Sequence, residues 1–120
     1  MSVFKLDLSE TAHVLQNSGK EFDLFFSHGT LETELYKPDR VDNQVPHERD
    51  EIYIIASGSG KFEMEGEITS VKQGDFLFVP AGAVHKFREF THDFSTWVIF
   101  YGPKGGEKGQ MKNFLHSCTG

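Results

Sequence analysis

A histidine and a glutamate close together in the chain are the first candidates for chemistry in this sequence. His47 lies at a strand end just after Pro46, and Glu51 opens the next predicted strand, so a tight turn could bring imidazole and carboxylate together. Strand alternation places Glu51 on one face with Tyr53 and Ile55. If that face is the interior of a barrel, burying the carboxylate is costly unless it is paired or bound to a cation.

The same residues also admit a purely structural explanation. Glu51 can face solvent or pair with Arg49 or Arg88, and His47 can be a capping or loop histidine. A metal ion would offset the cost of burying the carboxylate. The residue types by themselves leave both arrangements open.

A second histidine is placed by an unusual backbone path. Gly74 can take the positive φ of a turn before a strand at residues 75–79, and Pro80 ends that strand because it lacks an N–H group. Gly82 allows a tight, left-handed corner, which delivers His85 at the entry of the next strand. The alternative is an ordinary hairpin corner with a histidine on the surface.

The remaining segments are short, apolar and separated by turn residues. Such a pattern with almost no helix predicts an all-β sandwich or barrel. A short capped helix at residues 9–16, ended by residues 17–19, would cover one end or edge of the sheet. Strands are predicted at residues 22–26, 31–36, 51–56, 61–64, 68–72, 75–79, 84–89 and 94–101.

The length of 120 residues predicts a single domain with a continuous core. We place the domain at residues 1–104, with the barrel itself over about residues 22–102. Glycine and lysine then become frequent, which predicts a flexible tail over residues 105–120 with one weak helical turn at residues 111–115.

Composition narrows the classes of partner. The net charge of −6, without a basic block, disfavours binding to nucleic acid or an anionic membrane, so we expect a small-molecule partner. A single cysteine, Cys118, excludes an intrachain disulfide and points to a reducing compartment. No apolar run approaches the roughly 18 residues of a membrane span, and the first residues lack the apolar centre of a signal peptide. We therefore expect a cytoplasmic protein.

The corner before His85 resembles the second motif of the cupins, which are small double-stranded β-helix (jelly-roll) barrels. That motif, G-x5-P-x-G-x2-H-x3-N, is matched by Gly74, Pro80, Gly82 and His85, with Glu89 in the final asparagine position. The resemblance implies a cupin barrel over about residues 22–102, because the fold accompanies the motif.

The stretch around Glu51 is similar to the first cupin motif, G-x5-H-x-H-x3,4-E-x6-G, but matches it only in part. His47, Glu51 and Gly58 stand at the second histidine, the glutamate and the closing glycine. Val45 stands where the first histidine belongs, and Asp39 replaces the opening glycine.

The resemblance implies a metal site. In cupins with the full pattern, three histidines and one glutamate hold a divalent metal, and the match here leaves His47, Glu51 and His85. Two imidazoles and a carboxylate suit Fe, Zn, Mn or Ni and leave positions open for water, substrate or dioxygen. Val45 removes one donor and should lower the affinity. Gln44 is a weaker candidate, because strand parity turns it away from His47.

Further residues are candidates for lining a pocket, although plain core packing is the alternative for the aromatic ones. Glu89 shares strand parity with Phe87 and could form a hydrogen bond inside the barrel or pair with a nearby base. The pocket candidates are Gln44, Tyr36, Tyr53, Phe87, Glu89 and Trp97. Solvated surface positions are expected for His13, His28, His92, His116, Asp7, Glu10, Asp39 and Asp42.

Two functions from different classes fit these residues. One is a metal-dependent small-molecule enzyme, for which the resemblance implies dioxygenase, isomerase or lyase chemistry. The other is a non-catalytic binding or sensing module in which the metal is structural or absent. A purely structural association domain is a third, weaker hypothesis. Ile52, Ile54 and Ala56 form an apolar face opposite Glu51, and the resemblance favours a homodimer built by sheet packing.

Overall fold

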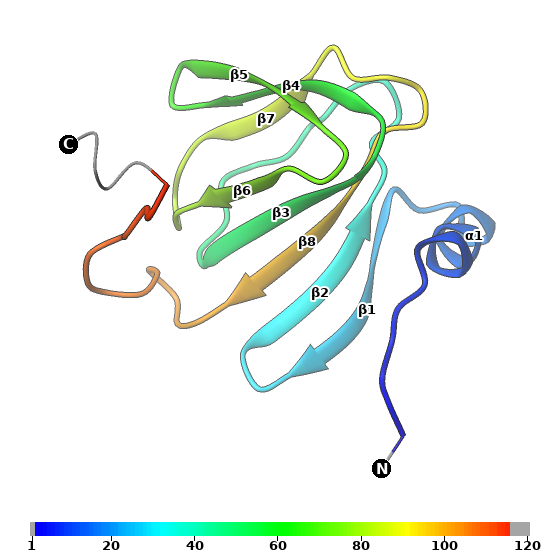
Figure 1. Cartoon of the computed structure of the whole chain (residues 1–120), viewed down its shortest axis with the longest axis horizontal. Helices are drawn as coiled ribbons and strands as arrows, with labels where there is room; N and C mark the ends of the chain where they lie inside the picture. The colour runs from blue at the N-terminus through cyan, green and yellow to red at the C-terminus, as the bar shows by residue number, and fades with distance from the viewer. Residues whose placement is uncertain (1, 116–120) are drawn as a thin grey trace.

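The computed structural model describes residues 2–115, which contain one helix and eight strands (Figure 1). The strands form two antiparallel sheets. The elements are α1 (Leu8–Ser18), β1 (Phe22–His28), β2 (Leu31–Tyr36), β3 (Asp50–Ser57), β4 (Ser59–Met64), β5 (Glu67–Lys72), β6 (Phe76–Val79), β7 (His85–Arg88) and β8 (Ser95–Tyr101). The all-β jelly-roll prediction is confirmed, and every strand overlaps its predicted range. His116 and Cys118 lie outside the described residues.

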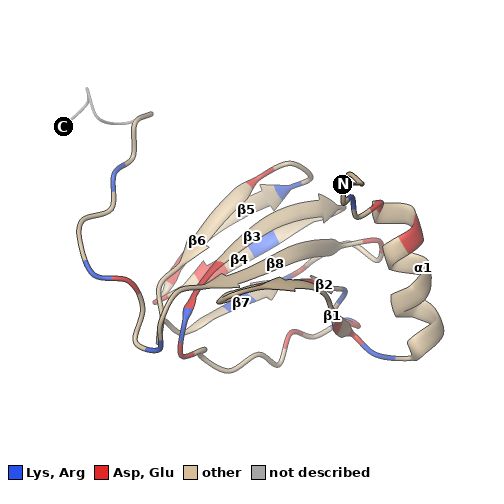
Figure 2. Cartoon of the chain, turned by 90° about the horizontal axis from the view of Figure 1, so that it is seen from below, with Lys and Arg blue, Asp and Glu red and all other residues tan. Residues whose placement is uncertain are grey.

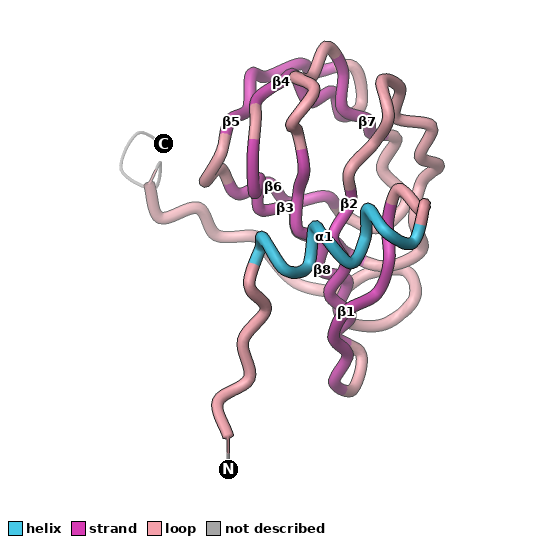
Figure 3. The backbone as a smooth tube through the Cα atoms, turned by 90° about the vertical axis from the view of Figure 1, so that its right-hand side faces the viewer, coloured by secondary structure: helices cyan, strands magenta, loops and turns pink. Residues whose placement is uncertain are grey.

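The larger sheet has the strand order β1-β2-β8-β3-β6, and the smaller has the order β5-β4-β7. In Figure 3 the smaller sheet lies opposite β1 and β8 of the larger sheet. Because side chains alternate along each strand, one face of the larger sheet lines the interior. Three rows of inward residues, each taken across β2, β8 and β3, are Glu32, Phe100 and Glu51; Glu34, Val98 and Tyr53; and Tyr36, Thr96 and Ile55.

Aromatic side chains fill one half of the interior, between β3, β4 and β7. The ring of Phe87 lies 4.9 Å from Tyr53, 5.1 Å from Phe62 and 4.9 Å from Phe94, measured between centroids. Tilted and edge-on contacts at these separations are favourable beyond the area they bury. Core packing thus accounts for the three buried phenylalanines, Phe62, Phe87 and Phe94.

The helix α1 begins and ends at capping residues. Asp7 is its N-cap, accepting a hydrogen bond of 2.9 Å from the backbone of Glu10, and Gly19 ends it with a φ of 75°. The predicted helix is confirmed, but the expectation that Asp7 is ordinary surface charge is wrong. The buried Leu15 packs with Leu35 on the outer face of the larger sheet, so α1 covers the barrel from outside (Figure 3).

The segment after β8 is attached to the barrel beyond the boundary that we predicted at residue 104. The backbone N–H of Gly105 donates to the carbonyl of Glu48 at 2.7 Å, and that of Glu107 donates to Asp50 Oδ2 at 2.7 Å. Within the described part of the tail, a turn at residues 114–115 takes the place of the predicted helical turn. The chain is therefore hydrogen-bonded to the barrel as far as Glu107.

The outer surface shows mixed charge and a partly covered apolar face. Lysine and arginine positions are scattered among acidic ones rather than gathered on one face (Figure 2). Ile52 and Ile54 are half-buried on the outer face of β3, whereas Ala56 is buried beside Leu15. None of the helical residues among 2–115 forms a segment long and apolar enough to cross a membrane.

Candidate metal centre

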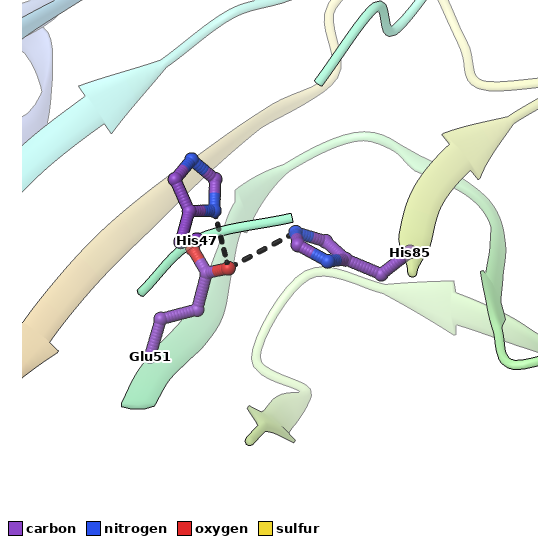
Figure 4. A group of neighbouring side chains, drawn as sticks. All are labelled: His47, Glu51 and His85. Carbon is purple, nitrogen blue, oxygen red and sulfur yellow. Dashed lines mark hydrogen bonds and ion pairs between the residues drawn. The ribbon is translucent and has the colours of Figure 1, made fainter. Parts of the chain in front are cut away.

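Three side chains from separate parts of the chain converge on one point inside the barrel (Figure 4). His47 comes from the loop before β3, Glu51 is on β3, and His85 is the first residue of β7. Glu51 Oε1 lies 3.1 Å from His47 Nδ1 and 3.0 Å from His85 Nε2. The structure thus brings together the residues that the family resemblance implies as ligands.

Backbone contacts between the two motif segments produce this convergence. Gly82 adopts a φ of 83° in the corner after β6, and its N–H donates to the carbonyl of His47 at 2.8 Å. The N–H of Ala83 closes the same corner on the carbonyl of Pro80 at 3.1 Å. The left-handed glycine therefore holds the loop of His47 beside the strand that begins at His85.

The three side chains differ in their access to solvent. Those of Glu51 and His85 are 1% and 0% exposed, whereas that of His47 is 32% exposed. A carboxylate at this depth is not solvated and needs protein or ion partners. The site consequently has a buried floor and one open side, at His47.

The electrostatics of the cluster favour a charged carboxylate. Burial raises the pKa of Glu51, but hydrogen bonds from His47 and His85 outweigh it and hold the pKa below its ordinary value. Burial lowers the pKa of His85, but its hydrogen bonds to Glu51 and to the Ala83 carbonyl raise it above the ordinary value. The metal-free cluster is therefore a carboxylate shared between imidazoles, of which His85 is readily protonated.

The donor set fits a divalent metal ion. His85 Nδ1 lies 2.9 Å from the carbonyl oxygen of Ala83, which can only accept, so Nδ1 carries hydrogen and Nε2 faces the site. Glu51 Oε2 is buried and has no hydrogen-bond partner. Leaving such an oxygen unpaired costs about 1–3 kcal/mol, which a cation would offset. One donor atom from each of the three residues lies within 4.8 Å of the others.

Comparison with known proteins identifies the family. Residues 33–99, more than half of the chain, match the sequence profile of the Cupin domain. The chain belongs to the cupin family. It is 34% identical over 106 residues to an uncharacterised protein of Streptomyces coelicolor, an alignment that covers 87% of this chain and 99% of the relative.

Two solved structures resemble this cupin. KdgF from Halomonas sp. gives a TM-score of 0.61 at 23% identity, covering 69% of this chain and 80% of that one. The DMSP lyase DddQ from Ruegeria pomeroyi gives 0.58 at 25% identity, covering 72% of this chain and 49% of that one. Both likenesses support the jelly-roll fold. They do not assign an activity, because one fold hosts many activities.

A tyrosine and a glutamine adjoin the cluster in this cupin. The Tyr53 hydroxyl lies 3.0 Å from His85 Nε2 and donates to Gln44 Oε1 at 3.0 Å. We expected strand parity to turn Gln44 away, but residues 42–47 form an irregular loop, in which alternation does not apply. Burial raises the pKa of Tyr53 well above its ordinary value, so the hydroxyl stays protonated.

Asp42, which we expected at the surface, is buried in the barrel and 7% exposed. Its carboxylate accepts hydrogen bonds from the Tyr36 hydroxyl at 2.8 Å, the Phe87 backbone at 2.8 Å and Gln44 Nε2 at 2.9 Å. These bonds compensate its burial and join β2, β7 and the loop before β3. An aspartate in a polar loop carries no periodic signal, so sequence reasoning missed it.

Of the six predicted pocket residues, Gln44 and Tyr36 line the larger cavity, Tyr53 and Phe87 are buried in the core, and Glu89 and Trp97 lie outside the interior. Glu89 follows the end of β7 with a φ of 49°, is exposed, and pairs with Lys61 at 3.4 Å. A left-handed residue breaks strand alternation, so Glu89 does not share the inward direction of Phe87. Trp97 occupies the outward position of β8 and packs with Leu35 in the cluster under α1. Core packing thus accounts for the tryptophan.

Two adjoining cavities open at His47, with volumes of about 250 and 450 Å³. The smaller is lined by Glu32, Glu34, His47, Glu48, Arg49, Phe100 and Lys104. The larger is lined by Glu21, Phe22, Glu34, Tyr36, Asn43, Gln44, Val45, His47, Val98 and Phe100. Val45, at the position of the absent histidine, is 69% exposed. Sequence reasoning missed Glu34, although the alternation of β2 placed it on the same face as Tyr36.

Proposed function

We propose that this cupin binds one divalent metal ion through His47, Glu51 and His85 and acts on a small molecule that enters beside His47. The observation that carries the proposal is the buried, unpartnered Oε2 atom of Glu51 next to two imidazole nitrogens. A purely structural carboxylate would be expected to have both oxygens paired.

A bound ion would supply Lewis-acid polarisation of a substrate oxygen or, if redox-active, a place for dioxygen. The residues of the chain would perform the remaining tasks. His85 presents Nε2 because Ala83 holds the hydrogen on Nδ1. The Tyr53 hydroxyl, held by Gln44, is a neutral hydrogen-bonding group beside that nitrogen.

The reaction class is limited by what lines the site. The cavities offer no serine or cysteine nucleophile, so covalent catalysis of those kinds has no group to carry it among the lining residues. Dioxygenase, isomerase and lyase chemistry are compatible with a divalent ion held by His47, Glu51 and His85, which would supply Lewis-acid or redox chemistry. The likeness to a DMSP lyase supports including lyase chemistry.

Metal content tests the proposal. Protein purified without chelator and dialysed against mixed divalent salts should carry about one metal per chain, and His85→Ala should abolish that binding because the site loses a buried donor. His28→Ala is the matched control, since His28 is exposed at the end of β1 and outside the cluster. Equal metal content in the wild type and His85→Ala would contradict the proposal.

One observation favours the alternative, a non-catalytic binding or sensing module. Glu51 Oε1 already serves both imidazoles, so the cluster can close as a hydrogen-bonded triad without a metal. Val45 offers no fourth donor. A chain that stays metal-free in replete medium yet binds a small molecule in the larger cavity would favour this function.

We also infer a homodimer packed through the outer face of the larger sheet. Ile52 and Ile54 are half-buried there, and Phe76 on the neighbouring edge strand is 63% exposed. Apolar residues gathered on one sheet face are typical of an interface. Sedimentation at micromolar concentration should give twice the chain mass of 13.6 kDa, and a monomer would contradict the inference.

A further inference from the structure

The larger cavity carries negative charge that no lining cation balances. Glu21 and Glu34 are the acidic residues of its wall, and lysine and arginine are absent from the described residues that line it. Phe22, Tyr36 and Phe100 also line it, and the guanidinium of Arg49 lies over the Phe100 ring, 5.7 Å from its centroid. A carboxylate beside aromatic rings is a favourable environment for a cation, because each ring face carries partial negative charge.

Glu34 differs from every other charged side chain around the two cavities. The others are already paired: Glu21 Oε1 accepts from the Asp39 backbone at 2.9 Å, Glu32 binds Arg49, Glu48 pairs with Lys104 at 3.6 Å, and His47 contacts Glu51. Within residues 2–115, the side chain of Glu34 forms no hydrogen bond or ion pair, although its backbone pairs with β1 and β8. It is therefore the one charged group of the cavity walls left to bind a ligand.

The surroundings of Glu34 penalise its charge in the absence of a ligand. Burial is the main reason that its pKa is raised, and the neighbouring carboxylates of Glu32 and Glu51 raise it further. A cation in the cavity would offset this penalty by adding to the effect of His47, whose charge lowers the pKa of Glu34. Arg49, which lines the smaller cavity, pairs with Glu32.

The strand register places Glu34 at a useful separation from the candidate metal centre. Glu34, Val98 and Tyr53 are directly opposite one another on β2, β8 and β3, and all three face the interior. Neighbouring strands are about 4.8 Å apart, so Glu34 and Tyr53 are separated by about 10 Å at the backbone. Glu34 and His47 line the same cavity, so a small molecule in it can contact both.

We propose that the cavity recognises a small organic cation, a protonated amine or alkylammonium compound, and that Glu34 determines this specificity. The inference rests on the proposed function for the location of the site, because the cavity includes His47. Charge selection depends on Glu34 and the aromatic walls, and it should persist in protein from which metal has been removed.

The test compares ligands of equal shape and different charge. Choline, a quaternary ammonium alcohol, and 3,3-dimethyl-1-butanol, its uncharged carbon analogue, would be titrated by calorimetry into metal-free and metal-loaded protein. Ethanolamine would serve as a primary amine. We expect choline to bind about tenfold more tightly than its analogue, as a cation–π contact together with an ion pair would give.

The variant Glu34→Gln keeps the shape of the side chain and removes its charge. We expect it to bind choline no more tightly than the neutral analogue while retaining the metal content of the wild type. Glu67→Gln makes the same charge change at an exposed position of β5 and should keep the preference for the cation.

Three results would overturn the inference: equal binding of choline and its analogue to the wild type, a preference that survives in Glu34→Gln, or binding of neither choline nor ethanolamine at millimolar concentration. Failure of the metal proposal gives a different signature, in which the cation preference is intact but the chain holds no metal. The two proposals can therefore fail separately.

Discussion

The interior of the barrel has two halves that are filled in different ways. Between β3, β4 and β7, the rings of Tyr53, Phe62 and Phe87 contact one another, and none of the three lines either of the two cavities at His47. Beneath β1, β2 and β8, the inward residues include Glu34 and Phe100, and the space between them is open. The cluster of His47, Glu51 and His85 lies where the halves meet.

This difference separates residues that maintain the barrel from residues available for binding. Close packing stabilises the aromatic half, because each ring loses contacts if a neighbour is removed. The open half leaves a half-buried carboxylate without a partner, which costs stability and is expected at sites of function. Substitutions in the aromatic half should therefore mainly lower stability, whereas substitutions in the open half should mainly lower ligand binding.

The largest effect on stability is expected for Phe87→Ala in the aromatic half. Phe87 is 2% exposed and contacts three aromatic rings, so its truncation should lower the free energy of unfolding by about 3–5 kcal/mol. Phe22→Ala in the open half should cost much less, since Phe22 is 55% exposed. Urea denaturation measures both, and similar losses would show that the halves do not differ.

Asp42→Ala should have the next largest effect, because Asp42 connects the two halves. Its loss leaves the backbone N–H of Phe87 and the Tyr36 hydroxyl without their acceptor, and we expect a loss of about 2–3 kcal/mol. Asp42→Asn keeps an acceptor oxygen and should recover part of that loss in the same denaturation experiment. Unchanged stability in Asp42→Ala would show that these hydrogen bonds do not contribute to the stability of the barrel.

The pH dependence of stability should change sign with metal loading. The raised pKa of His85 stabilises the metal-free fold below the ordinary histidine pKa, and that contribution is lost as pH rises through the folded-state value. The lowered pKa of Glu51 stabilises the fold above the ordinary glutamate value, and that contribution is lost as pH falls through the folded-state value. Metal binding requires an unprotonated Nε2, so affinity should increase as pH rises.

Thermal melts at about pH 6 and 8 measure this dependence, since a pKa difference of one between the folded and unfolded states corresponds to about 1.4 kcal/mol. From pH 6 to pH 8 the metal-free chain should lose stability. The stabilisation of the metal-loaded chain over the metal-free chain should increase over the same range. His85→Gln should abolish the His85 contribution. The same trend with and without metal would contradict a site on His85.

The smallest effect is expected for Glu89→Gln. Glu89 is exposed and pairs with Lys61 at the surface, so its neutralisation should change stability by less than about 0.5 kcal/mol. Metal content and ligand binding should stay at wild-type values. A clear loss of metal content or of ligand binding would show that Glu89 belongs to the site, as its place in the second cupin motif predicts.

Local rules predicted much of the fold and the positions of the motif residues, whereas the resemblance to the cupins implied that His47, Glu51 and His85 form one metal cluster. Strand alternation placed Glu51 with Tyr53, and Gly74, Pro80 and Gly82 determined a corner through their own backbone preferences. These are properties of a few neighbouring residues, so they can be deduced without knowledge of the remaining chain. The same rules failed at Glu89, where one left-handed residue ended the alternation.

The sequence by itself thus determined a barrel of short strands and the two motif segments that carry histidine and glutamate. Only the tertiary structure decided that Asp42 is buried, that Gln44 reaches Tyr53 and that Glu34 lacks a partner. The physical reason is the range of the interactions. A turn depends on backbone angles within a few residues, whereas burial and pairing depend on which distant segments the folded sheets bring to the same place.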